Sequence, residues 1–167
     1  FQHRVFHWLY PLWLLHRVHH TDLDFDVTTG SRFHPLSILI SMLFKFALIY
    51  GLGPLPVAVL AAEVLLNGTS MFNHSNIRLP ASVDRALRWM IVTPDMHRIH
   101  HSVVDTENEC KFGFNFSCWE RLFGTYLSAA ALPQDQMAVG ITPFDETDAV
   151  RLDKLLTQPF CKRPSGS

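Results

Sequence analysis

Three short histidine-rich segments constrain the possible fold more than any other feature of this sequence. They read H-R-V-F-H at residues 3–7, H-R-V-H-H at residues 16–20 and H-R-I-H-H at residues 97–101. On an α-helix, residues three and four apart share one face, so each segment is predicted to direct its imidazoles to one side. Because neutral imidazole is the commonest side-chain ligand of transition metals, the fold must bring these distant segments to a common metal site.

The number of histidines predicts a dinuclear site. The three segments hold eight of the ten histidines, and none of the three cysteines lies in a C-x-x-C pair. Structural zinc usually takes four ligands that often include thiolates, and soluble di-iron bundles use Glu with Glu-x-x-His. Nitrogen-rich sites instead suit iron, copper or zinc. The candidate metal ligands are His3, His7, His16, His19, His20, His34, His74, His97, His100 and His101.

Polar side chains near the histidines are candidates for orienting the ligands. A metal-bound histidine usually donates its other ring N–H to a carboxylate or a carbonyl. Asp22 and Asp26 follow the second segment, and Asp95 lies two residues before the third. Asn115, within the aromatic run F-G-F-N-F, is a further candidate. For the loop aspartates, a simple solvated turn is an equally good interpretation.

An apolar stretch from Pro35 to Asn67 predicts a helical hairpin. Lys45 and Glu63 are its only charged residues, and G-L-G-P-L-P at residues 51–56 divides it in two. Crossing a bilayer takes about 20 residues, so the hairpin either crosses with its flanks included or dips in and returns. A hairpin buried in a soluble bundle is the alternative. Since histidine segments flank it, both ends must lie on the side of the metal site.

Two local signals predict helix boundaries elsewhere. Pro11 should interrupt or bend the helix expected over residues 1–20. Ser82 is the expected N-cap of an amphipathic helix that continues to about Val92.

The composition favours a membrane-associated protein. Charged residues make up 17% of the chain, against about 25% in soluble domains. Basic and acidic residues, 14 and 15, nearly cancel, which argues against nucleic-acid binding. A chain of 167 residues fits one domain. The predicted fold is therefore all-α: a single membrane-associated helical bundle over residues 1–167, with an apolar helical hairpin, a histidine-lined dimetal site and a peripheral tail over residues 133–167.

The ordered motifs resemble those of the fatty acid hydroxylase/sterol desaturase superfamily. The resemblance covers about residues 1–127 and rests on H-R-V-F-H, H-R-V-H-H-T-D, R-F-H-P, F-N-H-S-N-I-R-L-P, T-P-D-M-H-R-I-H-H-S and F-G-F-N-F-S-C-W-E-R-L-F-G-T-Y. By this resemblance the three segments match the family's histidine boxes, and His74 matches an additional ligand between them. His34 would be a tenth ligand or a donor next to the ligands. The resemblance also implies transmembrane helices upstream of Phe1, so the chain is expected to be a fragment.

The resemblance implies an O₂-dependent oxidoreductase that hydroxylates or desaturates a lipid, such as a sterol or fatty acyl chain. It would be integral to the membrane, with the metal site on the cytoplasmic side. The implied cofactor is two iron ions, for which zinc can substitute in preparations. The sequence lacks G-x-G-x-x-G, C-x-x-C-H and iron–sulfur cysteine spacings, so a separate redox protein or reductase must supply electrons. The implied partners are thus a lipid substrate, the bilayer and this electron donor, without nucleic acid.

Two other functions are compatible with the residues. Imidazole-bound zinc activates water in hydrolases and lyases, which would require neither O₂ nor a reductant. A metal transporter or another non-enzymatic metal-binding membrane protein is the second. A transporter is expected to place its ligands at the membrane midplane, whereas every histidine segment here lies outside the apolar hairpin.

Overall fold

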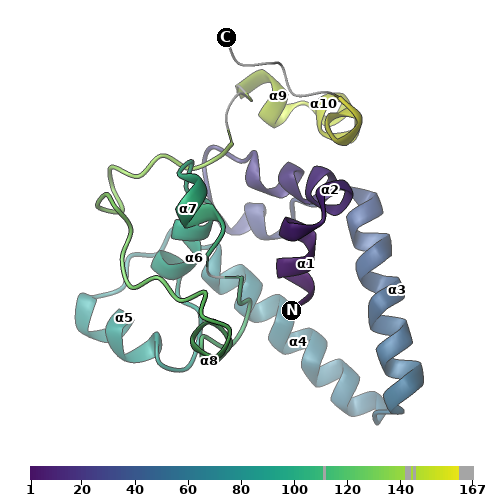
Figure 1. Cartoon of the computed structure of the whole chain (residues 1–167). Helices are drawn as coiled ribbons and strands as arrows, with labels where there is room; N and C mark the ends of the chain where they lie inside the picture. Colours follow the sequence, from purple (N-terminus) through teal and green to yellow (C-terminus); the bar gives the residue numbers. More distant parts are fainter. Residues whose placement is uncertain (111, 142–143, 145, 162–167) are drawn as a thin grey trace.

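The computed structural model describes residues 1–110, 112–141, 144 and 146–161 (Figure 1). Over these residues the fold is all-helical, as predicted, and the extended backbone forms only isolated bridges between Ile91 and Phe116 and between Ser102 and Val139. The last part of the predicted tail, residues 162–167, lies outside the described residues.

Two short helices carry the first two histidine segments. Helix α1 spans Gln2–Trp8 and α2 spans Tyr10–His20, and the two pack against each other. Leu9 between them is extended, with φ −87° and ψ 111°, and Pro11 lies in the first turn of α2. Proline is tolerated there because that position has no intrahelical N–H partner, so the predicted interruption is confirmed.

The apolar stretch forms two long helices, α3 (Pro35–Leu52) and α4 (Pro56–Asn73). Gly53 ends α3 in the left-handed conformation, with φ +57°, and the helices diverge from this turn (Figure 1). Among the described residues, α3 is the one helix long and apolar enough to cross a membrane. Only 6% of its apolar window is buried, so α3 is not buried against the other described residues.

The amphipathic helix expected over residues 82–92 is shorter than predicted. Helix α5 spans Ala81–Leu87, and Pro80 rather than Ser82 occupies its N-cap position. Beyond Leu87 the backbone pairs with a distant segment instead: Val92 N–H donates to the carbonyl of Asn115 at 3.0 Å. This long-range pairing competes successfully with continuation of the helix.

The remaining helices surround the histidine segments. The third segment lies on α6 (Pro94–His100), whose N-cap Thr93 accepts a hydrogen bond from Met96 N–H. The C-terminal segment packs on α2 through η2 (Gln158–Phe160), where Arg17 donates to the carbonyl of Gln158. The other short elements are η1 (Val27–Ser31), α7 (Asp105–Asn108), α8 (Cys118–Leu122), α9 (Glu146–Val150) and α10 (Leu152–Thr157).

Candidate metal centre

Nine of the ten histidines converge on two neighbouring points in the interior. Within each group, one ring nitrogen per histidine lies within 4.8 Å of the others. The groups adjoin each other, since the rings of His20 and His101 stack with centroids 4.4 Å apart. Site A comprises His3, His7, His16, His20 and His100, and site B comprises His19, His74, His97 and His101.

The H-x-x-H-H spacing divides each segment between the two sites. In α2 the first and last histidines of the motif belong to site A, and His19 belongs to site B. In the third segment the assignment is reversed: His100 belongs to site A, and the first and last histidines belong to site B. Successive residues on an α-helix are about 100° apart. Residue i+4 therefore points about 40° to one side of residue i, whereas residue i+3 points about 60° to the other side. Each motif therefore contributes histidines to both sites.

In site A, backbone carbonyls fix the ring orientation. The Nδ1 of His3 lies 2.8 Å from the carbonyl oxygen of Phe112, and the Nδ1 of His100 lies 2.7 Å from that of Cys110. A carbonyl only accepts, so each Nδ1 must carry the proton and donate it. The two Nε2 atoms, 3.1 Å apart, then face each other with lone pairs when the rings are neutral.

Site B repeats this arrangement. The Nδ1 of His19 donates to the carbonyl of Thr29 at 3.0 Å, and the Nδ1 of His74 donates to that of Ser70 at 2.7 Å. Their Nε2 atoms are 3.2 Å apart. Both sites therefore turn pairs of proton-free nitrogens towards a common centre.

Burial keeps these imidazoles neutral. It lowers the pKa of His3 from 6.5 to about 3 and that of His74 to about 4. Burial likewise lowers the pKa of His16 and His97 well below 6.5, and neighbouring histidines contribute to the shift. Without a proton, facing lone pairs repel each other, whereas a cation between them would be coordinated. The donor set thus fits two metal ions that accept imidazole ligands.

His101 gives independent support for a cation at site B. Its side chain is fully buried, and neither of its ring nitrogens has a hydrogen-bond partner. The Nδ1 of His97 also lacks one. An unsatisfied buried polar atom costs about 1–3 kcal/mol, and a metal–nitrogen bond would offset that cost.

The structure places His34 outside both sites. It is the N-cap of α3, where its Nδ1 accepts a hydrogen bond from Leu36 N–H at 3.2 Å. Its Nε2 donates to the carbonyl of Leu156 at 3.2 Å. Both ring nitrogens are used, so His34 is positioned as a helix cap and not as a ligand.

The predicted supporting aspartates do not contact the histidines directly. Asp22 reaches His19 only through Thr29, whose hydroxyl donates to the Asp22 carboxylate at 2.7 Å and whose carbonyl accepts from His19. Asp26 caps η1 by accepting from Thr28 N–H. Backbone carbonyls occupy the positions expected for carboxylates. A neutral carbonyl avoids the cost of burying a charge beside the ligands.

Asp95 and Asn115 also lie elsewhere. The carbonyl of Asp95 accepts from the Gln134 side chain, and the carbonyl of Asn115 pairs with Val92 N–H. Their side chains have no described contact with a histidine ring. Asn108, which the sequence analysis did not single out, lies 3.4 Å from the Nδ1 of His20.

Aromatic side chains wall the two sites, a role that the sequence analysis did not assign to them. Phe33 stacks on His19 with ring centroids 4.5 Å apart, and Phe25, which is fully buried, meets the edge of His101 at 4.9 Å. Apolar walls exclude water and strengthen electrostatic interactions within the site. The sequence signal was available in both cases, since these residues lie in the loop that follows the second segment.

Gly30 permits close packing of η1 on His74. A Cβ at position 30 would lie 3.2 Å from the His74 Nδ1 and 3.4 Å from the Ser70 carbonyl that this nitrogen contacts. We expect Gly30→Ala to displace the ring and weaken metal binding at site B about tenfold, the lower end of the effect of disturbing ligand-orienting contacts. Metal titration should show this loss of affinity for Gly30→Ala. The matched variant Gly68→Ala should bind metal with unchanged affinity, because a Cβ at position 68 would meet open space. Equal affinities in the two variants would contradict it.

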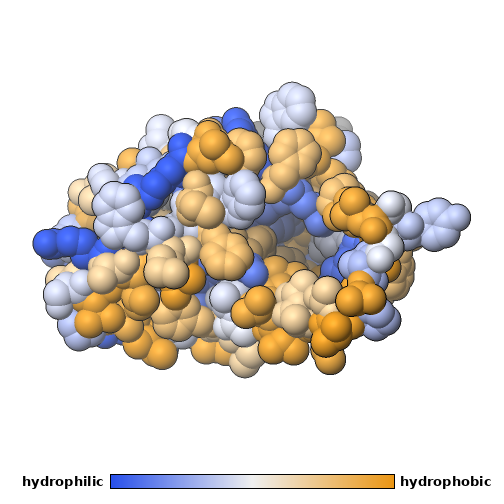
Figure 2. Space-filling model, turned by 90° about the horizontal axis from the view of Figure 1, so that it is seen from below, coloured by the Kyte–Doolittle hydropathy of each residue, from blue (hydrophilic) through white to orange (hydrophobic). Residues whose placement is uncertain are grey.

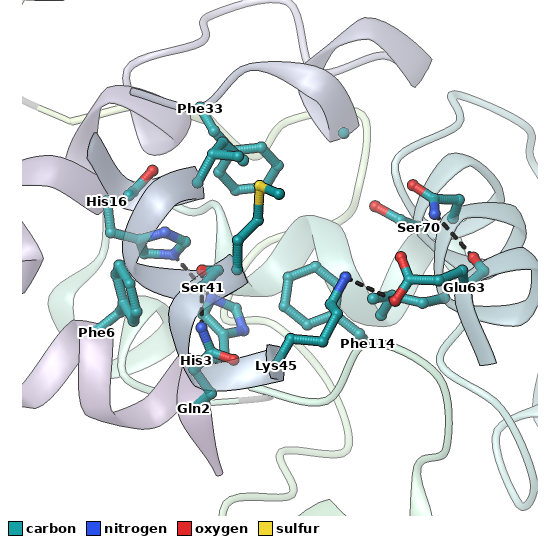
Figure 3. Close-up of a pocket in the computed structure, with 16 residues that line it drawn as sticks. Gln2, His3, Phe6, His16, Phe33, Ser41, Lys45, Glu63, Ser70 and Phe114 are labelled. Carbon is teal, nitrogen blue, oxygen red and sulfur yellow. Dashed lines mark hydrogen bonds and ion pairs between the residues drawn. The ribbon is translucent and has the colours of Figure 1, made fainter. Parts of the chain in front are cut away.

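A cavity of about 300 Å³ reaches site A from between α3 and α4. His3 and His16 lie at one end, and Lys45 and Glu63 face each other across it (Figure 3). Seen from the face that carries the hairpin, the surface is largely hydrophobic around a hollow with hydrophilic residues inside (Figure 2). The candidate centre is thus accessible from the apolar face of the molecule.

Known proteins of similar sequence are lipid-modifying enzymes by name. An ornithine lipid hydroxylase of Rhizobium tropici is 34% identical over 129 residues, which cover 74% of this chain and 37% of that protein. Alkylglycerol monooxygenase of Xenopus tropicalis is 25% identical over 126 residues, 75% of this chain and 27% of that protein. The chain thus spans about a third of the length of these relatives.

No solved structure matches the chain significantly. The family model described as fatty acid hydroxylase matches residues 1–125, the part that holds all nine converging histidines. The chain belongs to the fatty acid hydroxylase family.

Proposed function

We propose that residues 1–167 form the catalytic domain of a membrane-bound di-iron oxygenase that hydroxylates or desaturates a lipid. One observation carries this proposal: two adjacent groups of five and four histidines, with facing ring nitrogens and neither thiolate nor carboxylate among them. Family membership and the names of the relatives, a hydroxylase and a monooxygenase, support lipid oxidation. O₂ is the proposed oxidant.

Iron bound at both sites would supply O₂ reduction and oxidation of an unactivated C–H bond. The chain's own histidines would hold the ions in place, and Phe25 and Phe33 would exclude water from site B. Backbone carbonyls at Phe112 and Thr29 fix the tautomers of His3 and His19, so that each Nε2 stays available as a ligand. Among the described residues, none of the three cysteines belongs to a candidate metal group. Electrons are therefore proposed to come from a separate redox protein or reductase.

The hairpin is proposed to enter the bilayer with both ends at the metal site. The side chains of α3 and α4 are mostly exposed and apolar. His74 of site B lies directly at the outer end of α4, and Phe33, two residues before α3, stacks on His19 of the same site. Arg32 and Arg78 flank the hairpin, and basic flanks favour the cytoplasmic side.

Cysteine labelling tests this topology. In a chain whose three cysteines are replaced by serine, Ser31→Cys and Asn76→Cys should react with an impermeant reagent from the same face of sealed vesicles. Both positions are exposed, one on each side of the hairpin. Reaction from opposite faces would contradict the topology, because the flanking histidine segments share both sites.

Product analysis tests the activity itself. Lipids of cells that express the complete protein should gain an oxygen atom from isotopically labelled O₂, or lose two hydrogens, only when O₂ and the two-metal protein are present. Mass spectrometry distinguishes these products. A lipid changed equally well without O₂ and without reductant would instead indicate the zinc hydrolase or lyase alternative.

A further inference from the structure

An ion pair joins the two arms of the apolar hairpin. Lys45 Nζ and Glu63 Oε1 lie 2.6 Å apart, and they are the only charged residues between Pro35 and Asn67. Their side chains are 37% and 36% exposed, so both retain free surface inside the cavity that they line. Charged residues in a membrane-entering segment are costly, and they commonly mark substrate pathways.

The pair belongs to two polar stripes that face each other. On α3 the stripe repeats at i, i+4 and i+8, and on α4 at i, i+4 and i+7, which are the spacings of one helix face. All other faces of the hairpin are predominantly apolar and exposed. The stripe residues, which all line the cavity, are Ser37, Ser41, Lys45, Glu63, Asn67 and Ser70.

The stripes connect the ion pair to site A. Gln2, the neighbour of His3, donates a hydrogen bond to the hydroxyl of Ser41 at 2.7 Å, midway along the α3 stripe. Figure 3 shows Lys45, Glu63, Ser41 and His3 around the same space. From Ser37 to Lys45 the stripe is about 12 Å long, at the rise of an α-helix.

The polar part of this lining does not suit a bare hydrocarbon chain. An alkyl chain would cover the ammonium, carboxylate and amide groups without offering hydrogen bonds, which is unfavourable. If the pair served only to join the arms, an apolar pair would do so at lower desolvation cost. The cavity therefore matches an occupant that has both polar atoms and an alkyl part, since apolar side chains such as Phe6, Met42 and Leu66 line it beside the polar stripes.

We propose that Lys45 and Glu63 bind the polar part of the lipid substrate and thereby select lipids with hydrogen-bonding groups close to the oxidised carbon. The ligand class is a lipid polar group that both donates and accepts, such as a hydroxyl, amide or amine. Lys45 donates to it and Glu63 accepts from it, and the alkyl chains extend through the apolar rim into the bilayer. Binding of a polar lipid group at this ion pair does not depend on the proposed function. Only the identification of that lipid as a substrate rests on it.

Equilibrium binding tests the assignment without turnover. The full chain, loaded with redox-inert zinc and held in lipid nanodiscs, is titrated with radiolabelled 1-O-hexadecylglycerol and with hexadecane, which has the same alkyl length but no polar group. Wild type should bind 1-O-hexadecylglycerol about tenfold more tightly than hexadecane, as expected for one hydrogen bond to a charged group. The double variant K45M/E63L should lose this preference, whereas K45R/E63D should keep it.

A matched control removes an ion pair elsewhere. Arg151 and Asp153 form an exposed pair, 2.9 Å apart, on the far C-terminal segment, so R151M/D153L should bind both probes like wild type. Two bound ions per chain and an unchanged melting temperature show that each variant is folded. Equal binding of both probes by wild type, or an intact preference in folded K45M/E63L, would overturn the assignment. Because the probes are not converted, a failure to detect lipid oxidation would count against the proposed function alone.

Discussion

Replacing His19 or His100 by alanine is expected to remove one metal ion and abolish lipid oxidation. His19 belongs to site B and His100 to site A, so each substitution opens a different coordination sphere. Both side chains are fully buried, and the loss also removes the ring N–H that donates to the carbonyl of Thr29 or of Cys110. The metal content measured by elemental analysis should fall from about two ions per chain to about one. Product formation should fall below detection.

His34→Ala is the matched control, because it removes a histidine that lies outside both sites. It should lower stability by about 1 kcal/mol through loss of the α3 N-cap and leave two ions bound. Cys161→Ala should also leave most activity, since this thiol is exposed and belongs to neither site. If His34→Ala loses a metal ion, or if His19→Ala retains two, the assignment of ligands is wrong.

Removing the metals is expected to destabilise the fold strongly at neutral pH and more strongly in acid. Without cations, the facing Nε2 atoms of His3 and His100 remain 3.1 Å apart with no proton between them. Metal binding free energy is folding free energy where the site forms only in the folded chain. The chelator-treated protein should therefore unfold at a temperature well below the unfolding temperature of the two-metal protein. Adding zinc back should restore the higher unfolding temperature.

The sign of the acid effect follows from the lowered pKa values. In the folded metal-free chain the pKa of His3 is about 3 and that of His74 about 4, against 6.5 when unfolded. Above pH 6.5 both states are neutral at these positions, so no stability is lost. As the pH falls below 6.5, the unfolded state binds protons that the folded state does not, and each such histidine costs about 1.4 kcal/mol per pH unit. A metal-free protein equally stable at pH 7 and pH 5 would contradict this.

Local patterns in the sequence predicted the main structural elements. Histidines three and four apart imply a shared helix face, and apolar residues interrupted by glycine and proline imply a hairpin, because both depend on a few neighbouring residues. The hairpin's far end was predicted less well. The predicted hairpin ends at Asn67, but α4 continues to Asn73, since Asn67 and Thr69 donate to the helix carbonyls of Glu63 and Leu65 rather than ending the helix.

The sequence by itself therefore determined that clustered histidines lie beside an apolar hairpin, and it predicted a dimetal site there. Only the tertiary structure decided which histidine belongs to which site, that His34 caps a helix, and that carbonyls rather than Asp22 or Asp26 orient the rings. The physical reason is that these outcomes depend on how distant helices are oriented to one another. Every residue carries a carbonyl, so no sequence pattern marks the few that packing brings within 3.0 Å of a ring nitrogen.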